Sequence, residues 1–361
     1  NRTLRRIQLT GAKLITTVAG RDALQPADGA GPNAAILQIG GLAVGPDGVY
    51  FSSLAYPPGP QPAVPQAGIY LMPNGGGPLR LVVGNGTPGQ VVAGPATDTG
   101  VVGRGLAFDG DILYFLTEYG SLWKTDALPS GSGVVLEHVA GQEGTYGDQV
   151  GSGATALLPR DLRDVAVDSA GMVYLSGPQH AQIRRVDAAG TVTKWLSGAA
   201  GEPVDGPRAS ARNNVVGGIA VGSPAGQGEA VVFADPLNNR IRAVRIGANQ
   251  VVTLAGSTSP ATTMSTVAAR SANFAHVTDV DYDSLGNAYV ADVDANVVRK
   301  IDVNGLQTVI LGTGEAYPDA ATLPVGPTPG RLRPISEPWS VAVDKGATPR
   351  YLYVASRADF E

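Results

Sequence analysis

Three carboxylates alternate along one short stretch of the sequence, at Asp279, Asp281 and Asp283. In an extended strand alternate residues point to the same side, so these side chains would lie together. Carboxylate and carbonyl oxygens are the ligands that Ca²⁺ prefers, which makes Asp279 and Asp281 the candidate metal ligands and Ca²⁺ the candidate cofactor. We expect instead that Asp281 pairs with a nearby arginine or an ordered water and that Asp283 stabilises a turn, so that the chain has no cofactor and Ca²⁺ is the alternative.

Further polar residues stand just before short apolar runs that are scattered along the chain. If those runs converge in the fold, the polar residues form a ring of mixed charge that could bind a ligand. The residues of this ring are Arg104, Arg163, Asp164, Thr278, Asp279 and Trp339. We expect a ligand site at Arg104, Arg163, Asp164, Asp279 and Trp339, joined by His276 from the preceding segment. A solvated rim is the alternative.

Other familiar chemistry finds little support. The chain has no cysteine, which excludes disulfides, thiolate zinc sites and cysteine nucleophiles. Its three histidines, His138, His180 and His276, lie in unrelated parts of the sequence. No serine stands in a G-x-S-x-G motif, and the glycine run after Asn74 lacks the Lys-Ser or Lys-Thr pair of a phosphate loop.

The composition describes a globular chain with many turns. Hydrophobic residues make up 43% and charged residues 16%, with 49 glycines and 27 prolines. The net charge of −5 contains no acidic or basic block, so neither a nucleic-acid partner nor direct insertion into a membrane is expected. Asn1 does not begin a signal peptide, and we expect a processed or excised piece of a larger protein. The excess of arginine over lysine fits a GC-rich bacterial coding bias.

One short pattern recurs along the chain at a period of roughly sixty residues, and it shows which elements must position these side chains. It consists of a small residue between apolar ones. The six copies are Gly41-Leu-Ala-Val44, Gly105-Leu-Ala-Phe108, Asp164-Val-Ala-Val167, Gly218-Ile-Ala-Val221, Asp279-Val-Asp-Tyr282 and Ser340-Val-Ala-Val343. Asp281 alone replaces the alanine of this pattern.

Three further short apolar runs, separated by polar turns, follow most copies, so each unit holds four strands. Four-stranded units at this period are typical of a β-propeller, whose blades surround one axis. The sixth unit supplies two strands before the C-terminus, and the chain opens with two more near Leu4 and Leu14. We therefore predict a single domain over residues 1–361, an all-β, six-bladed β-propeller of four-stranded antiparallel blades. The N-terminal strands complete the C-terminal blade, which is shared between residues 1–20 and 338–361.

Two units carry a more specific motif, in Phe233-Ala-Asp235-Pro-Leu-Asn-Asn239-Arg-Ile-Arg242 and in Tyr289-Val-Ala-Asp292-Val-Asp-Ala-Asn296-Val-Val-Arg299. They resemble the NHL-repeat propellers, in particular the bacterial members, and the resemblance implies the same fold. The first three units depart from this motif. From the residues themselves we expect the two aspartates to form Asx-turns and the two asparagines to adopt left-handed geometry. The recurring Arg5, Arg184, Arg242 and Arg299 are expected to cover neighbouring strand surface.

Six long connections join the units, at residues 20–40, 84–103, 141–162, 198–216, 256–276 and 312–337. In a propeller they emerge on the same face as the hairpins between second and third strands, and that face is the candidate recognition surface. We therefore expect a non-enzymatic, monomeric binding module, secreted or on the cell surface, that presents these connections to a protein, peptide or glycan. The alternative is a metal-assisted lyase or hydrolase at the central channel, because some propellers of similar architecture are metal-dependent lyases or lactonases.

Overall fold

The computed structural model describes residues 3–11, 13–19, 39–54, 67–74, 78–126, 134–177, 181–198, 201–224, 228–257, 262–315, 328–330 and 334–356. Within these ranges the regular secondary structure is β-strand, apart from 3₁₀ turns at η2 (Pro236–Asn238) and η3 (Ala269–Ser271). In this part of the chain no helix is long and apolar enough to cross a membrane.

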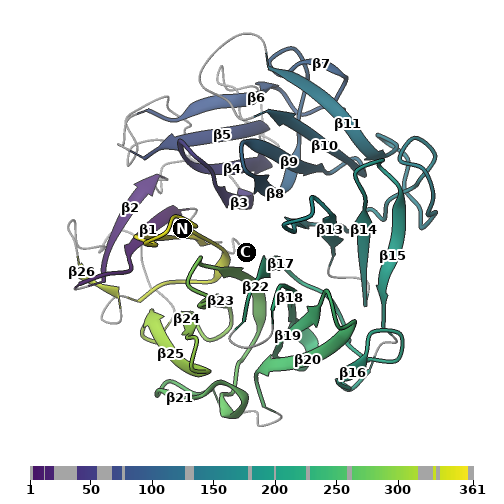
Figure 1. Cartoon of the computed structure of the whole chain (residues 1–361). Helices are drawn as coiled ribbons and strands as arrows, with labels where there is room; N and C mark the ends of the chain where they lie inside the picture. The colour runs from purple at the N-terminus through teal and green to yellow at the C-terminus, as the bar shows by residue number, and fades with distance from the viewer. Residues whose placement is uncertain are drawn as a thin grey trace.

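Six antiparallel sheets surround a central axis, which confirms the predicted six-bladed β-propeller (Figure 1). The four core strands of each blade follow one another from the axis outward. Blade 1 contains β3 (Ile39–Val44), β4 (Gly48–Leu54), β5 (Ala67–Pro73) and β6 (Arg80–Gly86). Blade 2 contains β8 (Gly103–Asp109), β9 (Ile112–Thr117), β10 (Ser121–Asp126) and β11 (Val135–Gly141). Blade 3 contains β12 (Asp164–Val167), β13 (Val173–Ser176), β14 (Gln182–Val186) and β15 (Val192–Ser197). Blade 4 contains β17 (Ile219–Gly222), β18 (Ala230–Asp235), β19 (Arg240–Arg245) and β20 (Gln250–Ala255). Blade 5 contains β22 (Val277–Tyr282), β23 (Ala288–Asp292), β24 (Val297–Ile301) and β25 (Leu306–Leu311). Blade 6 contains β27 (Pro338–Val343), β28 (Tyr351–Ser356), β1 (Thr3–Gln8) and β2 (Leu14–Ala19).

The two ends of the chain meet in blade 6, as predicted. Strand β1 pairs with β28 in an unbroken antiparallel register from Thr3 opposite Ser356 to Gln8 opposite Tyr351. Figure 1 shows these first and last strands side by side in one blade. Because β1 fills the ladder of β28, the ring closes through main-chain hydrogen bonds and leaves no unpaired edge there.

The connections add a feature that the repeat pattern did not predict. Four of them place a two-residue fifth strand on the outer edge of the blade that they precede: β7 (Gly94–Pro95), β16 (Gly206–Pro207), β21 (Val267–Ala268) and β26 (Thr328–Pro329). In blade 3 an isolated bridge between Gly151 and Val192 lies at the corresponding place. Each of these connections therefore wraps around the next blade instead of staying on one face, and it covers an edge that could otherwise pair with another chain.

Apolar side chains fill the spaces between neighbouring blades. Between blades 4 and 5, Val232, Ile241 and Val290 form one buried cluster with Phe274, which belongs to the connection that leads into blade 5. Such burial contributes about 1.5 to 3 kcal/mol for each large apolar side chain. The connections are thus packed parts of the fold.

The asparagines of the repeated motif adopt the predicted left-handed conformation, with φ of 51° at both Asn239 and Asn296. The expected Asx-turns at Asp235 and Asp292 are wrong. The fully buried carboxylate of Asp292 accepts hydrogen bonds from the backbone N–H groups of Ala275 and His276, at 3.0 and 2.8 Å. Asp235 accepts one from Asn214 at 3.2 Å. These carboxylates fasten the preceding connection to its blade, because the amides of that connection would otherwise be buried without an acceptor.

The recurring arginines lie inside the blades, where we expected them to cover strand surface. Arg184, Arg242 and Arg299 are at most 2% exposed. The guanidinium of Arg299 lies 2.8 Å from the Asp292 carboxylate, and that of Arg242 lies 3.0 Å from Asp205. Arg184 pairs with Asp148. A buried guanidinium requires such a partner, and Asp148 and Asp205 supply it from the connections.

Candidate functional site

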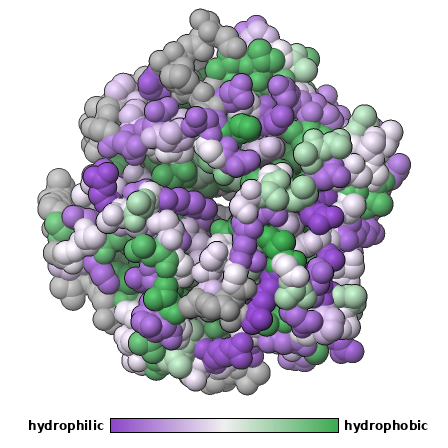
Figure 2. Space-filling view, viewed as in Figure 1, coloured by the Kyte–Doolittle hydropathy of each residue, from purple (hydrophilic) through white to green (hydrophobic). Residues whose placement is uncertain are grey.

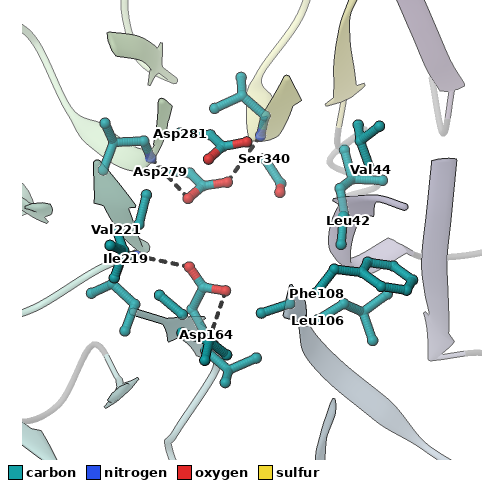
Figure 3. A pocket seen from close by; sticks show the side chains of 18 of the residues that line it. Leu42, Val44, Leu106, Phe108, Asp164, Ile219, Val221, Asp279, Asp281 and Ser340 are labelled. Atoms are coloured by element: carbon teal, nitrogen blue, oxygen red, sulfur yellow. Dashed lines mark hydrogen bonds between the residues drawn. The ribbon is translucent and has the colours of Figure 1, made fainter. Parts of the chain in front are cut away.

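The six innermost strands line a narrow channel along the axis. The channel has a volume of about 70 Å³, enough for a few waters, and its polar lining comes from Asp164, Asp279, Asp281, Ser340 and Lys345. Figure 2 shows a small opening at the centre of the ring, and Figure 3 shows the channel from close by. The opposite wall is apolar and includes Leu42, Leu106 and Phe108.

The strands approach one another most closely at the first residue of the recurring pattern. A Cβ on Gly41 would lie 2.6 Å from the carbonyl oxygen of Arg104, and one on Gly105 would lie 2.5 Å from the Cα of Asp164. A Cβ on Gly218 would overlap the Oδ1 atom of Asp279. Glycine is therefore required at these places because the neighbouring strand occupies the space of a side chain.

Two blades carry a carboxylate at this level instead of glycine. Oδ1 of Asp164 accepts a hydrogen bond from the N–H of the next residue, Val165, at 2.9 Å, and Oδ2 accepts one from Ile219 of blade 4 at 2.7 Å. The Asp279 carboxylate accepts hydrogen bonds from the N–H of the next residue, Val280, at 2.8 Å and from that of Val341 in blade 6 at 2.9 Å. Each carboxylate thus joins its own strand to the innermost strand of the following blade.

Asp281 repeats this arrangement one step deeper in the channel. Its carboxylate accepts hydrogen bonds from the N–H groups of Tyr282 and of Val343 in blade 6, both at 2.8 Å. The ammonium group of Lys345 lies 3.0 Å from it. The charged partner is therefore a lysine where an arginine or a water was expected. Asp283 forms the predicted turn, accepting hydrogen bonds from the N–H groups of Leu285 and Asn287.

Asp164 and Asp279 project into the channel toward one another (Figure 3). Burial, reinforced by the negative charge of Asp279, raises the pKa of Asp164 well above its usual range. Burial also raises the pKa of Asp279 to about 7, against the opposing effect of its hydrogen bonds to Val341 and Ser340. Two half-buried carboxyl groups that face each other retain protons more readily than an exposed pair.

The predicted metal ligands Asp279 and Asp281 do lie on one strand and line one channel. Across the described ranges, however, no group of three or more histidine, aspartate or glutamate side chains is placed to hold a metal ion. The oxygens of both carboxylates accept hydrogen bonds from backbone amides. The Ca²⁺ site stays a prediction.

The predicted ring at the mouth of the channel is assembled as the repeats imply. Arg104 and Arg163 stand at equivalent places on neighbouring strands, since Gly105 contacts the carbonyl of Arg163. The Arg104 guanidinium lies 3.6 Å from the Glu118 carboxylate, and Arg163 is exposed. On the other side of the axis, the Thr278 hydroxyl donates to the carbonyl of half-buried Trp339 at 3.0 Å.

Neither of the two described histidines, His138 and His276, lines the channel. The Nδ1 atom of His276 lies 3.4 Å from the carboxylate of Asp294, in the turn between β23 and β24. His138 lies on the outer strand β11, as predicted, with its ring 5.1 Å from that of Trp123. His180 lies outside the described residues. Ser340 and Lys345 line the channel but were not among the predicted site residues, although Ser340 was marked by its place in the repeat.

Solved structures share this fold at low sequence identity. A Bacteroides thetaiotaomicron protein of unknown function is 13% identical, with a TM-score of 0.59 over 98% of this chain and 76% of that chain. Another Bacteroides thetaiotaomicron protein, provisionally named a phosphatase, is 10% identical, with a TM-score of 0.59 over 100% of this chain and 80% of its own. A protein provisionally named a gluconolactonase is 12% identical, with a TM-score of 0.51 and 98% of each chain covered. At such identity the likeness shows the fold alone. No protein-family model and no curated protein matches the chain.

Proposed function

We propose that this propeller is a binding module of NHL type, and that it presents one face to a protein, peptide or glycan partner. That face, called the connection face below, carries the two ends of each connection, where it leaves one blade and enters the next, and the hairpins between second and third strands. The observation that carries the proposal is that the described connections are packed into the blades. Phe274 and Leu158, for example, are buried within connections. A surface fixed in this way loses little conformational entropy on binding.

The arrangement of the channel also supports a binding role. The three carboxylates that sequence reasoning singled out for chemistry each join neighbouring strands through backbone amides. Both oxygens of each are engaged, and the channel is too narrow for a drug-sized substrate. Secretion or display on a cell surface would suit a module that binds other macromolecules.

Two tests apply to this function. Immobilised protein is panned with a displayed peptide library and probed on a glycan array, and selected ligands are then measured against variants of the connection face. Leu237→Glu changes a side chain that is 65% exposed on a connection-face hairpin, and Leu285→Glu changes one that is 58% exposed on the opposite face. The proposal expects ligands that lose affinity in the first variant and retain it in the second. Ligands that respond only to Leu285→Glu would contradict it.

The alternative function is hydrolysis or lyase chemistry at the channel, and one observation favours it. Asp164 and Asp279 have raised pKa values and face each other in a cavity, which is typical of acid and base pairs in catalysis. Lactone, ester and phosphate-ester substrates with added Ca²⁺ test this directly. Turnover that disappears in Asp279→Asn, while the variant remains folded, would replace the binding proposal with the enzymatic one.

A further inference from the structure

Three arginines gather on the connection face beside the mouth of the channel. Arg104 and Arg163 begin neighbouring innermost strands, and Arg160 lies in the connection that leads into the second of them. Arg160 and Arg163 are exposed. The Arg104 guanidinium lies 3.5 Å from the carbonyl of Leu162, the residue that precedes Arg163 and stands two positions after Arg160. The chain as a whole has a net charge of −5, so this cluster opposes the overall charge. We call these three residues the arginine patch.

The side chain of Arg160 is supported from below by an aromatic ring. Its guanidinium carbon lies 5.5 Å from the centre of the Tyr146 ring, a cation–π arrangement. The same ring packs on Gly120, where a Cβ would lie 3.0 Å from it, and the Tyr146 hydroxyl donates to the carbonyl of Glu118 at 3.2 Å. A guanidinium stacked on a ring keeps its N–H groups available for another partner, because stacking uses the flat face of the group.

Arg104 is only weakly engaged. Its contacts with Leu162 and with the Glu118 carboxylate, at 3.5 and 3.6 Å, lie at the outer limit of hydrogen-bond geometry. Its Nε atom is buried without a hydrogen-bond partner. Glu118, which lies beside Arg104, is 24% exposed, Asp164 follows Arg163 directly and is half-buried, and Asp161 is buried. Arg104 therefore retains guanidinium donors that a further carboxylate could satisfy.

We propose that the arginine patch binds a carboxylate-rich segment of a partner protein. The inference rests on the proposed function and names the chemistry of its partner. Guanidinium groups accept carboxylates through paired N–H donors, which gives both affinity and orientation. The opposite face carries exposed carboxylates on its hairpins, at Asp47, Asp111 and Asp126. The connection face also carries exposed carboxylates, at Asp294 and Glu202, so the arginines of the patch, rather than the charge of the whole face, would hold the acidic segment.

A protein segment fits this surface better than a glycan. Sugar rings bind proteins largely by lying against a free aromatic face, and the Tyr146 ring already packs against Gly120 and Arg160. Although the Tyr146 ring is 36% exposed, the Arg160 guanidinium already lies over it, so the patch offers charged donors before it offers an aromatic surface. Aspartate and glutamate side chains of an extended segment can each reach one guanidinium.

The test uses a fluorescent ten-residue peptide of alternating Glu and Asp, with a Gln and Asn peptide as the neutral probe. Fluorescence anisotropy measures their affinity for the unaltered chain at several salt concentrations. The patch variant is Arg160→Glu with Arg163→Glu, and the matched control is Arg350→Glu, which reverses an exposed arginine on the opposite face. We expect the acidic peptide to bind at low salt, to weaken as salt rises, and to lose at least tenfold in affinity in the patch variant alone.

Absence of binding, or an equal loss in Arg350→Glu, would overturn the inference. So would tighter binding of an oligogalacturonate or an oligouridylate than of the acidic peptide, since each names another class of partner. A milder variant, Arg160→Gln with Arg163→Gln, keeps the test decisive if charge reversal impairs folding. One further outcome is that library-selected ligands lose affinity in Leu237→Glu and keep it in the patch variant. Such a result would support the proposed function and refute this inference.

Discussion

The carboxylate of Asp164 accepts a hydrogen bond from the backbone N–H of Ile219, at 2.7 Å and across the boundary between blades 3 and 4. Asp279 and Asp281 do the same across the boundary between blades 5 and 6. The residues that most suggested chemistry in the sequence thus hold the ring together at its axis. This role leads to measurable consequences for stability.

Replacing Asp281 with alanine should destabilise the protein by about 1 to 3 kcal/mol, since the buried N–H groups of Tyr282 and Val343 lose their acceptor. Urea unfolding followed by tryptophan fluorescence measures the change. The control is Lys345→Ala, which removes only the half-exposed cation of the pair and should cost about 1 kcal/mol or less. Equal losses in the two variants would show that the ion pair, rather than the amide hydrogen bonds, stabilises this boundary.

Adding one methyl group at Gly218 should be far more damaging than adding one at Gly247. A Cβ at Gly218 would overlap the Asp279 carboxylate and lie 2.9 Å from the Cα of Asp279. No atom lies within 4 Å of the place that a Cβ at Gly247 would occupy. We expect Gly218→Ala to cost about 1 to 3 kcal/mol or more through overpacking. Gly247→Ala should remain within about 0.5 kcal/mol of the unaltered chain. Thermal melts of both variants compare them, and matching melting temperatures would contradict the close approach of β17 and β22.

The raised pKa of Asp279 predicts how stability depends on pH. A carboxyl group whose pKa is higher in the folded chain binds its proton more tightly there than in the unfolded chain. Its contribution to stability is therefore complete below its ordinary pKa, and falls as the pH rises toward about 7. Asp279→Asn should flatten this fall, which begins near the ordinary aspartate pKa of about 4. The test is to measure the unfolding free energies of the unaltered chain and of Asp279→Asn between about pH 4 and pH 7. A fall that is as steep or steeper in the variant would contradict the prediction.

The buried pair of Arg299 and Asp292 should be sensitive to the loss of one member. Arg299→Ala leaves the fully buried carboxylate of Asp292 without its cation, at an expected cost of about 3 to 5 kcal/mol. The comparison is Arg270→Ala, at an exposed arginine in the connection that precedes the same blade. Calorimetric melting should show a large shift for the first variant and little for the second. A small shift at Arg299 would mean that the side chain only fills space.

The sequence predicted the propeller and its closure because each depends on a repeated local pattern. The alanine that recurs as Ala43, Ala166 and Ala342 marks each innermost strand, and the strands missing after Ser356 are found at the N-terminus. Interactions between units were harder to predict. Asp205 and Arg242 form an ion pair although neither their spacing nor any short motif links them. The fifth strands at the blade edges were missed because each is only two residues long, and at β7 and β16 its Gly-Pro sequence is typical of a turn.

The positions of several candidate residues followed from the repeats, whereas their role in binding stays a prediction. Equivalent places in the repeats brought Arg104, Arg163, Asp164 and Asp279 to the axis as expected. Whether a carboxylate there binds a ligand or a backbone amide depends on how closely the next strand approaches, and a single sequence does not contain that distance. In the sequence the close approach is marked by the glycines at 41, 105 and 218, whose role becomes clear in three dimensions.

Hydrogen exchange measured by mass spectrometry, with and without a bound ligand from the peptide or glycan screens, tests the central claim most directly. We predict slower exchange in the described parts of connections 141–162 and 256–276 and in the hairpin after Asp235, with no change in the turns at Asp47, Asp168 and Asp302. Protection confined to those turns, or to the channel-lining strands alone, would show that the partner binds elsewhere and would contradict the assignment of the connection face.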